Sequence, residues 1–472
     1  MDKQEIPFLS ASQLSGLIAS KEVSPVEATE AYLDRIGLLD GKLNSYITVT
    51  GDQALESARD AERAIASGGY LGPMHGIPVA VKDQFNTAGI RTTGGSNLLW
   101  DYVPDEDATV VANLKTAGAV LLGKLNLSEF ALGESFHHPA GVPRNPWDLE
   151  RNPGISSSGS AAATAAFLCT TSLGEDTGGS TRIPAAWSGL VGHRPTWGLV
   201  SRYGVLPACW SMDTVGPLSR TMEDCAITLQ AIAGYDPKDP YTRHEPAPDY
   251  RAALDGDIRG IRIGVITEKV YGDDVDREVT EAVAAATGVL GELGATVEQV
   301  SIPLLEHGGA VSKCLTDMEA AAVHHQWLKS RAAEYDHNSR VRLLTAILTP
   351  AQVYYKAQKL RAMIRAHILE QLQRVDVLVL ATSPAAAPRI ADAPGIKSQE
   401  DAHSRMAGVR SFTGPFNLAN LPAVSVPCGF TSDNLPIGLQ IAGRPFEDAT
   451  VMKVGHAYEQ NTDWHTRRPP EA

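Results

Sequence analysis

Residues 173–204 read LGEDTGGSTRIPAAWSGLVGHRPTWGLVSRYG, and the interpretation of the whole chain depends on them. Two glycines stand directly before Ser180, so the backbone can approach a ligand closely and turn several N–H groups toward it. Backbone N–H groups beside a nucleophile are what an oxyanion intermediate requires. Gly-Gly-Ser is also typical of a simple turn, so these letters alone make Ser180 a candidate nucleophile and no more.

A second serine cluster lies upstream, in residues 154–161, GISSSGSA. It does not match a phosphate-binding loop, because that motif needs a lysine directly after its second glycine and Ser160 stands there. It does not match the nucleophile elbow G-x-S-x-G either, because Ser158 stands where the last glycine belongs. By itself this octapeptide indicates a Ser/Gly turn that caps a helix.

A lysine ends an apolar strand in residues 77–83, IPVAVKD. Lys82 in this place indicates one of two things. Either it emerges at a functional strand end, or it is a terminal lysine whose charged head reaches solvent.

Short β-rich runs alternate with helical stretches along the chain. Residues 9–67 are predicted to be helical, since their segments begin at serines and repeat apolar residues at helical spacing, and so are residues 276–292. Alternation of buried strands with helices predicts an α/β fold with a largely covered, mixed sheet. The predicted strands are 77–83, 119–126, 261–267, 376–383, 423–429 and 437–443.

Taken together, Lys82, the serines at 156–158 and Ser180 match one known pattern, and the chain resembles the amidase signature family over nearly its whole length. The resemblance implies an α/β amidase-signature fold, with a central mixed β-sheet covered by helices on both faces. The pieces that carry it are PVAVKDQFNTAG, NPGISSSGSAAA, residues 173–204, MDTVGPLSRTMEDCA, NLANLPAVSVPCG and LPIGLQIAG.

The resemblance also implies the domain organisation. We expect a single amidase-signature domain over residues 1–472, with an N-terminal helical segment at about 1–67 and a core at about 68–472. The proline-rich residues 236–250, DPKDPYTRHEPAPDY, are predicted to form an exposed connection.

Catalytic roles follow from the resemblance, residue by residue. Ser180 matches the nucleophile, and Ser156 matches the bridging serine that the family places 24 residues earlier. Lys82 matches the general base. In the family the bridging serine follows a cis peptide bond, usually after glycine, whereas Ile155 precedes it here. The expected oxyanion hole is formed by the N–H groups of Thr177, Gly178, Gly179 and Ser180.

The chemistry is consistent without the family name. A serine hydroxyl is a poor nucleophile until a base removes its proton, and lysine can do so only when neutral, so Lys82 should be buried. A hydroxyl both donates and accepts, so Ser156 can pass a proton from Ser180 to Lys82. The same relay then protonates the leaving nitrogen of an amide. We therefore expect an acyl-enzyme on Ser180, with no metal and no cofactor.

Composition sets expectations about partners and location. Lys+Arg 41 against Asp+Glu 55 gives a net charge of −14, dispersed along the chain, which argues against nucleic acid and anionic membranes. The five cysteines are far apart and odd in number, which is typical of reduced thiols in a cytosolic protein. No secretory leader or bilayer-spanning run is visible. We expect a cytoplasmic monomer or homodimer with a small-molecule amide or carbamate substrate.

Substrate choice is predicted from residues 127–147 and from Trp187, which the resemblance places at the acyl and leaving-group pockets. Apolar and aromatic side chains dominate these segments, which favours neutral aryl or alkyl amides, carbamates included. The residues expected to bind substrate are Phe130, Gly133, Phe136 and Trp187.

Two other functions stay open. One is the A subunit of a Glu-tRNA(Gln)/Asp-tRNA(Asn) amidotransferase, which shares the core, takes ammonia from glutamine and works with a partner protein. In such proteins an acidic residue stands where this chain has Arg410, which argues for a free-standing amidase. The other is a catalytically inactive binding protein.

Overall fold

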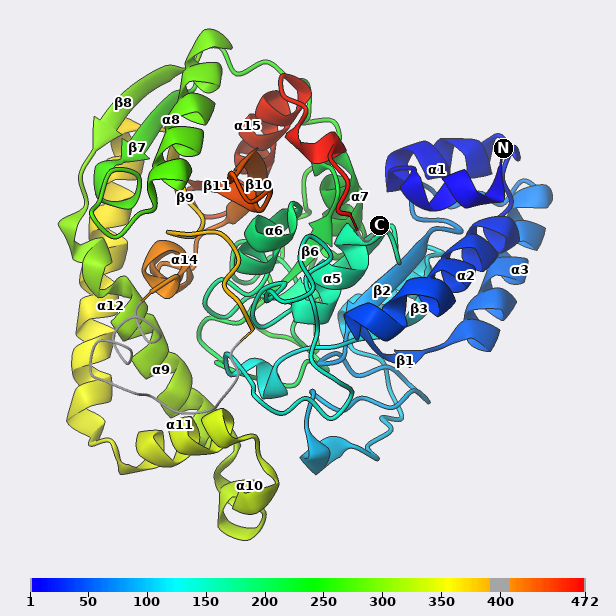
Figure 1. The fold of residues 1–472 in the computed structure, drawn as a ribbon, viewed down its shortest axis with the longest axis horizontal. Helices are drawn as coiled ribbons and strands as arrows, with labels where there is room; N and C mark the ends of the chain where they lie inside the picture. The colour runs from blue at the N-terminus through cyan, green and yellow to red at the C-terminus, as the bar shows by residue number, and fades with distance from the viewer. Residues whose placement is uncertain (1, 391–407, 471–472) are drawn as a thin grey trace.

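A computed structural model describes residues 2–390 and 408–470 and arranges them around one mixed sheet (Figure 1). The sheet has eleven strands in the order β1-β3-β2-β4-β6-β5-β10-β11-β9-β7-β8. The strands are β1 (Tyr46–Val49), β2 (Pro78–Lys82), β3 (Val120–Leu125), β4 (Thr171–Glu175), β5 (Val191–Arg194), β6 (Val215–Ser219), β7 (Arg262–Ile266), β8 (Thr296–Val300), β9 (Val377–Ala381), β10 (Ala423–Phe430) and β11 (Pro436–Gly443).

Helices cover both faces of this sheet, which confirms the predicted α/β class. Helices α5 and α6 pack against each other and on the central strands, while α7 and α15 form a second contacting pair on the same strands. The α-helices are α1 (Ala11–Ala19), α2 (Pro25–Leu43), α3 (Gly51–Ala66), α4 (Thr109–Thr116), α5 (Ser158–Ala165), α6 (Arg182–Ser188), α7 (Met222–Ile232), α8 (Arg277–Glu292), α9 (Gly308–Val323), α10 (His325–Ser330), α11 (His337–Leu348), α12 (Ala351–Arg374), α14 (Arg410–Leu418) and α15 (Asp448–Gln460). The short 3-10 helices are η1 (Lys3–Phe8), η2 (Asn97–Leu99), η3 (Glu129–Ala131), η4 (Thr267–Lys269), η5 (Pro303–His307), η6 (Ala332–Glu334) and η7 (Trp464–Thr466).

The N-terminal segment is mostly helical, as expected, but it is not helical throughout. Helix α2 begins after Ser24, whose side chain accepts from the backbone N–H of Glu27, and Pro25 occupies its first position. Strand β1 then lies between α2 and α3 and pairs antiparallel with β3 at the edge of the sheet. The prediction of a purely helical stretch at 9–67 is therefore wrong at β1.

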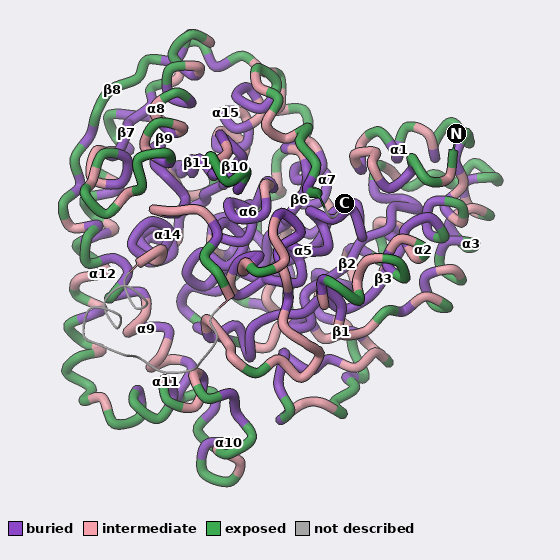
Figure 2. The backbone as a smooth tube through the Cα atoms, in the orientation of Figure 1, coloured by how far each residue is buried: buried purple, intermediate pink, exposed green. Residues whose placement is uncertain are grey.

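The centre of the sheet is buried on both faces. Every residue of β2, β4 and β6 is buried. In Figure 2 the backbone around β2 and β6 is mostly in the colour of buried residues. Such strands appear in the sequence as continuous apolar or small-residue runs instead of alternating ones. Because β2 runs parallel to β4, their carboxyl ends meet at one edge, and this edge brings Lys82 beside Glu175.

Residues 236–250 cross the surface between α7 and β7. Much of the segment is exposed, but Asp236, Asp239 and Thr242 are buried. Asp236 accepts hydrogen bonds from Thr109 and Ser201, which fasten the segment to the body of the protein. Strands on both sides of the segment belong to the same sheet.

Candidate active site

Lys82, Ser156 and Ser180 lie on three segments that are distant in sequence and that contact one another. Lys82 ends β2, Ser156 lies just before α5, and Ser180 stands between β4 and α6. Gly154 allows the close packing of the second segment, because its φ is +120° and a Cβ there would lie 2.2 Å from Pro184 Cα. The Ile155–Ser156 peptide bond is cis.

Lys82 is completely buried, and its Nζ donates a 2.8 Å hydrogen bond to Ser156 Oγ. Burial lowers the pKa of Lys82 to about 8, since the charged ammonium has lost its water; Glu175, Asp176 and Asp213 oppose that shift. A lysine in this state releases its proton far more readily than a solvent-exposed one. It is suited to serve as a base.

Glu175 is a member of the site that the sequence analysis missed. Its Oε2 lies 3.9 Å from Lys82 Nζ, and both side chains are fully buried. A weak signal was present, because Glu175 is a charged residue three positions before the double glycine that precedes Ser180. Its meaning depends on β2 and β4 being neighbours, which the sequence does not state.

A single hydroxyl proton links Glu175 to a second acid. Thr177 Oγ1 lies 2.6 Å from Glu175 Oε1 and 2.7 Å from Asp213 Oδ1. One hydroxyl has one hydrogen to donate, so one of the two carboxyl groups must donate to Thr177. Burial, followed by the charge of Asp213, raises the pKa of Glu175 to about 8. Burial raises the pKa of Asp213 as well, and the backbone N–H bonds that Asp213 accepts from Cys209 oppose that rise.

The loop that carries Ser180 is held from behind by Asp176 and Arg182. Asp176 Oδ2 accepts from Arg182 Nε at 3.0 Å, and Asp176 Oδ1 accepts from Arg182 Nη2 at 3.0 Å. Asn417 Nδ2, from α14, donates to Asp176 Oδ1 at 2.7 Å. Burial alone would raise the pKa of Asp176, but Arg182 and Arg194 hold it well below its usual range. These two side chains therefore position the loop.

One of the four N–H groups predicted to form the oxyanion hole, that of Gly179, already has a hydrogen-bond partner. The N–H of Gly179 donates to Asp176 Oδ1 at 2.8 Å, so it is already engaged. Among the described residues, nothing accepts a hydrogen bond from the N–H of Thr177, Gly178 or Ser180. Those three donors remain the predicted hole. Gly179 contributes its conformation instead, with φ +124° and a site where a Cβ would lie 2.3 Å from Thr413 Oγ1.

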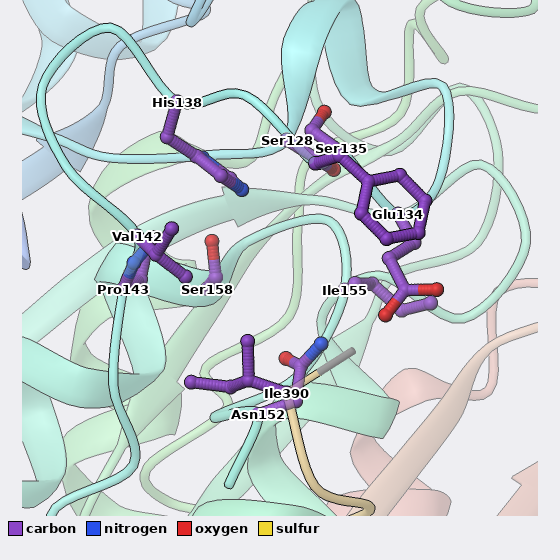
Figure 3. A pocket seen from close by; sticks show the side chains of 11 residues that line it. Ser128, Glu134, Ser135, His138, Val142, Pro143, Asn152, Ile155, Ser158 and Ile390 are labelled. Carbon is purple, nitrogen blue, oxygen red and sulfur yellow. The ribbon is translucent and has the colours of Figure 1, made fainter. Parts of the chain in front are cut away.

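A pocket opens beside the cis peptide bond (Figure 3). Ile155 and Ser158, which flank the bridging serine, form part of its wall, and Phe136 lines it as well. His138 and Ser158 approach the pocket from different segments in this view. The lining residues are Ser128, Glu134, Ser135, Phe136, His138, Val142, Pro143, Asn152, Ile155, Ser158 and Ile390. The segment expected to form the substrate wall therefore does line a pocket next to Ser156.

The other residues predicted to bind substrate are not among those that line this pocket. Phe130 is 3% exposed and packs against His324 and Trp327, inside a separate aromatic cluster. Trp187 is 6% exposed, and its Nε1 donates to Ser383 Oγ at 3.0 Å. Gly133 lies against the guanidinium of Arg342, since a Cβ there would be within 2.4 Å of Nη1.

In the described part of the chain, no group of three or more His, Cys, Asp or Glu side chains is placed to hold a metal. No helix in that part has both the length and the apolar character needed to span a membrane.

Comparison with known proteins agrees with this geometry. A family model described as Amidase matches residues 27–452. The chain belongs to the amidase family. The resemblance drawn from the sequence is thus confirmed, together with the amide-cleaving class of chemistry that the family name implies.

Individual relatives of this amidase differ in what they are named for. The A subunit of the glutamyl-tRNA(Gln) amidotransferase of Moorella thermoacetica is 42% identical, over 98% of this chain and 99% of its own. A solved chain from an unexpected vestigial protein complex, described as revealing the evolutionary origins of an s-triazine catabolic enzyme, is 32% identical with TM-score 0.89, covering 96% and 98%. A bacterial aryl acylamidase of the amidase signature family is 26% identical with TM-score 0.89, covering 97% and 98%.

These relatives contradict the expected partners of this amidase. The sequence analysis excluded nucleic acid and expected a monomer or homodimer. A protein that is 42% identical over its whole length is named as one subunit of an amidotransferase for glutamyl-tRNA(Gln). Net negative charge did not justify the exclusion, because one member of a complex need not contact the nucleic acid with its own surface.

Proposed function

We propose that this amidase cleaves carboxylic amide C–N bonds through an acyl-enzyme on Ser180, with Ser156 and Lys82 as its proton relay. The observation that supports the proposal best is the buried 2.8 Å hydrogen bond between Lys82 Nζ and Ser156 Oγ. A lysine whose pKa is lowered to about 8 by burial supplies the base.

In the first half-reaction, Ser180 Oγ attacks the carbonyl carbon, and its proton passes through Ser156 Oγ to Lys82 Nζ. The negative charge that develops on the carbonyl oxygen is stabilised by the N–H groups of Thr177, Gly178 and Ser180. When the C–N bond breaks, the proton returns from Lys82 through Ser156 to the leaving nitrogen. The acyl group stays on Ser180 as an ester.

In the second half-reaction, water attacks the acyl ester and gives its proton to Lys82 by the same path. The carboxylic acid leaves, and Ser180 Oγ recovers a proton. Atoms balance as one amide and one water giving one acid and one amine. Urethanes and activated esters can enter the same sequence, because each offers a carbonyl carbon and a leaving group.

A second proposal is that the reaction serves an amidotransferase, in which this chain is the glutamine-hydrolysing member. The relative from Moorella thermoacetica supports it, since it is named for that enzyme and matches this chain from end to end. Glutamine would then be hydrolysed at Ser180, and the leaving ammonia would pass to a partner's aminoacyl-tRNA site. The comparisons favour this assembly over an enzyme that works alone.

Two measurements test these proposals. A fluorophosphonate probe should label the wild type at Ser180 and should not label Ser180→Ala; an unlabelled wild type would leave only the inactive binding protein. Ammonia release from glutamine is then measured with the chain alone and with any stoichiometric partner that co-purifies from its source. Glutaminase activity with such a partner would support the amidotransferase role, and its absence would refute it.

A further inference from the structure

A third guanidinium, that of Arg410, stands directly against the nucleophile loop. Helix α14 begins at Arg410 and is fastened to the loop by Thr413 Oγ1, which donates to the carbonyl oxygen of Gly178 at 2.7 Å. A Cβ at Gly178 would lie 2.9 Å from Arg410 Cζ. Gly178 is two residues before Ser180, so the cation lies beside the reacting serine.

The cluster around Arg410 carries more positive than negative charge. Asp317 binds two cations, since Lys313 Nζ donates to its Oδ2 at 2.8 Å and Arg342 Nε donates to its Oδ1 at 3.1 Å. Within the described ranges, Arg410 bonds only to Thr316 Oγ1, at 3.3 Å, and pairs with no carboxylate. Among the described residues, two arginines and Lys313 therefore lie around Asp317. Asp176, the other carboxylate that acts on Arg410, is already bound to Arg182.

The cluster keeps its excess of positive charge near pH 7 even when Lys313 loses its proton. Burial, then the charge of Arg342, lowers the pKa of Lys313 to about 7, so Lys313 is partly neutral near pH 7. Burial, then Arg342, lowers the pKa of Arg410 to about 10, and Arg410 stays charged. With Lys313 neutral, Arg342 and Arg410 still exceed Asp317 by one charge.

The cluster is partly accessible to solvent. The side chains of Lys313, Asp317 and Arg342 are 12%, 15% and 17% exposed, and Arg410 is also partly exposed. Glycine makes room for both guanidinium groups: Gly178 for Arg410, and Gly133 for Arg342. A side chain at either glycine would displace the cation that it faces.

We propose that Arg410, with Arg342 and Lys313 beside it, forms an anion subsite that binds a carboxylate of the substrate. The inference rests on the proposed acyl-enzyme function, and it names the substrate class: an amide that carries a carboxylate and no neighbouring ammonium. A planar guanidinium binds carboxylate through two parallel hydrogen bonds. A substrate ammonium would meet Asp317, which is already bound to two cations. The proposal departs from the neutral aryl amides expected from residues 127–147. It also excludes glutamine, so it applies to the amidase of the first proposal and not to the amidotransferase of the second.

Three amides of similar length test the subsite: glutaramate, which ends in a carboxylate, hexanamide, which ends in a methyl group, and glutamine, which adds an ammonium. The wild type should have the highest kcat/KM on glutaramate. Arg410→Gln should lose about tenfold to hundredfold on glutaramate, the range of a charge-assisted hydrogen bond, with little change on hexanamide. Arg410→Lys keeps the positive charge but cannot form the two parallel hydrogen bonds. It should therefore recover part of the kcat/KM that Arg410→Gln loses on glutaramate.

A binding measurement makes the test independent of turnover. Glutarate should slow fluorophosphonate labelling of Ser180 in the wild type and should not slow it in Arg410→Gln. Equal kcat/KM losses on glutaramate and hexanamide, or labelling that glutarate leaves unchanged in the wild type, would overturn the subsite. So would a wild-type kcat/KM on hexanamide or glutamine equal to that on glutaramate. An unlabelled wild type would instead refute the acyl-enzyme itself, so the two failures are distinguishable.

Discussion

Replacing Glu175 with glutamine keeps the shape of the side chain and removes its ability to ionise. In the wild type, Glu175 Oε2 lies 3.9 Å from Lys82 Nζ. A carboxylate there stabilises the ammonium form and so raises the pKa of Lys82, against the lowering effect of burial. The neutral side-chain amide of glutamine does not stabilise the ammonium form of Lys82. The pKa of Lys82, and with it the midpoint of the alkaline rise in kcat/KM, should therefore move to lower pH.

The size of the shift follows from the separation. Two unit charges about 4 Å apart interact by about 4 kcal/mol at an effective dielectric constant of about 20, which corresponds to about three pH units. Because the pKa of Glu175 is itself raised to about 8, it is only partly ionised where Lys82 titrates. We therefore expect a fall of about one to three units. At pH 7, about one tenth of a lysine with pKa 8 is neutral, so even one unit raises the rate about fivefold.

The assay is kcat/KM on an unactivated amide between about pH 5.5 and about pH 10 at constant ionic strength. Glu459→Gln is the matched control, because Glu459 is another buried acid with its pKa raised to about 8, and it accepts from Met222 N between α15 and α7. This control should leave the midpoint in place. A midpoint that stays fixed, or that rises, in a Glu175→Gln protein that still reacts with fluorophosphonate would refute the reasoning.

Three further substitutions address the relay and its loop. Ser180→Ala should abolish turnover and leave the melting temperature close to that of the wild type, because only one small hydroxyl is lost; a residual rate above about a thousandth of wild type would exclude Ser180 as nucleophile. Lys82→Ala should reduce the rate on an anilide more than on the matched aryl ester, since the ester depends less on the returned proton; equal losses would contradict the Ser156 relay. Gly179→Ala should lower stability by more than about 1 kcal/mol, because its Cβ would collide with Thr413, and a denaturation midpoint equal to that of the wild type would disprove this.

Strands rich in branched apolar residues could be predicted from the sequence. The apolar runs at 77–83 and 376–383 match β2 and β9, and α8 was placed within one residue of its start. Five strands were missed. Strand β1 was assigned to a helical stretch, and glycine, proline or polar residues interrupt the other four. They are β4, with sequence TSLGE, β5, with VGHR, β6, with VGPLS, and β8, with TVEQV.

Tertiary hydrogen bonds explain why such polar strands can be buried. His193 in β5 bonds to Asp448 in α15 at 3.0 Å, and Thr171 in β4 bonds to Ser219 in β6 at 2.7 Å. A pattern of hydrophobicity contains no information about partners that lie far away along the chain. These strands could therefore be identified only from the structure.

Some residues of the candidate site could likewise be predicted from the sequence, and others could not. Lys82, Ser156 and Ser180 were named because they stand in ordered motifs. Glu175 was given no role, and Arg410 was named only as the residue that replaces an acid of the amidotransferase subunits. The importance of each comes from what lies beside it: Lys82 for Glu175, and Gly178 for Arg410. Sequence motifs identify the reacting groups, while the charges that tune them depend on how the sheet and α14 assemble.

The hydrogen bonds of Asp176 and Arg182 that position the nucleophile loop have a consequence for how the protein is made. Asp176 and Arg182 are secured by Asn417, and Arg182 Nη1 also donates to Gln440 Oε1 in β11 at 2.6 Å. A ribosome that has translated the chain only as far as β9 has made every catalytic side chain and neither of these anchors. The nascent chain should therefore stay inert toward amides until β11 has left the exit tunnel.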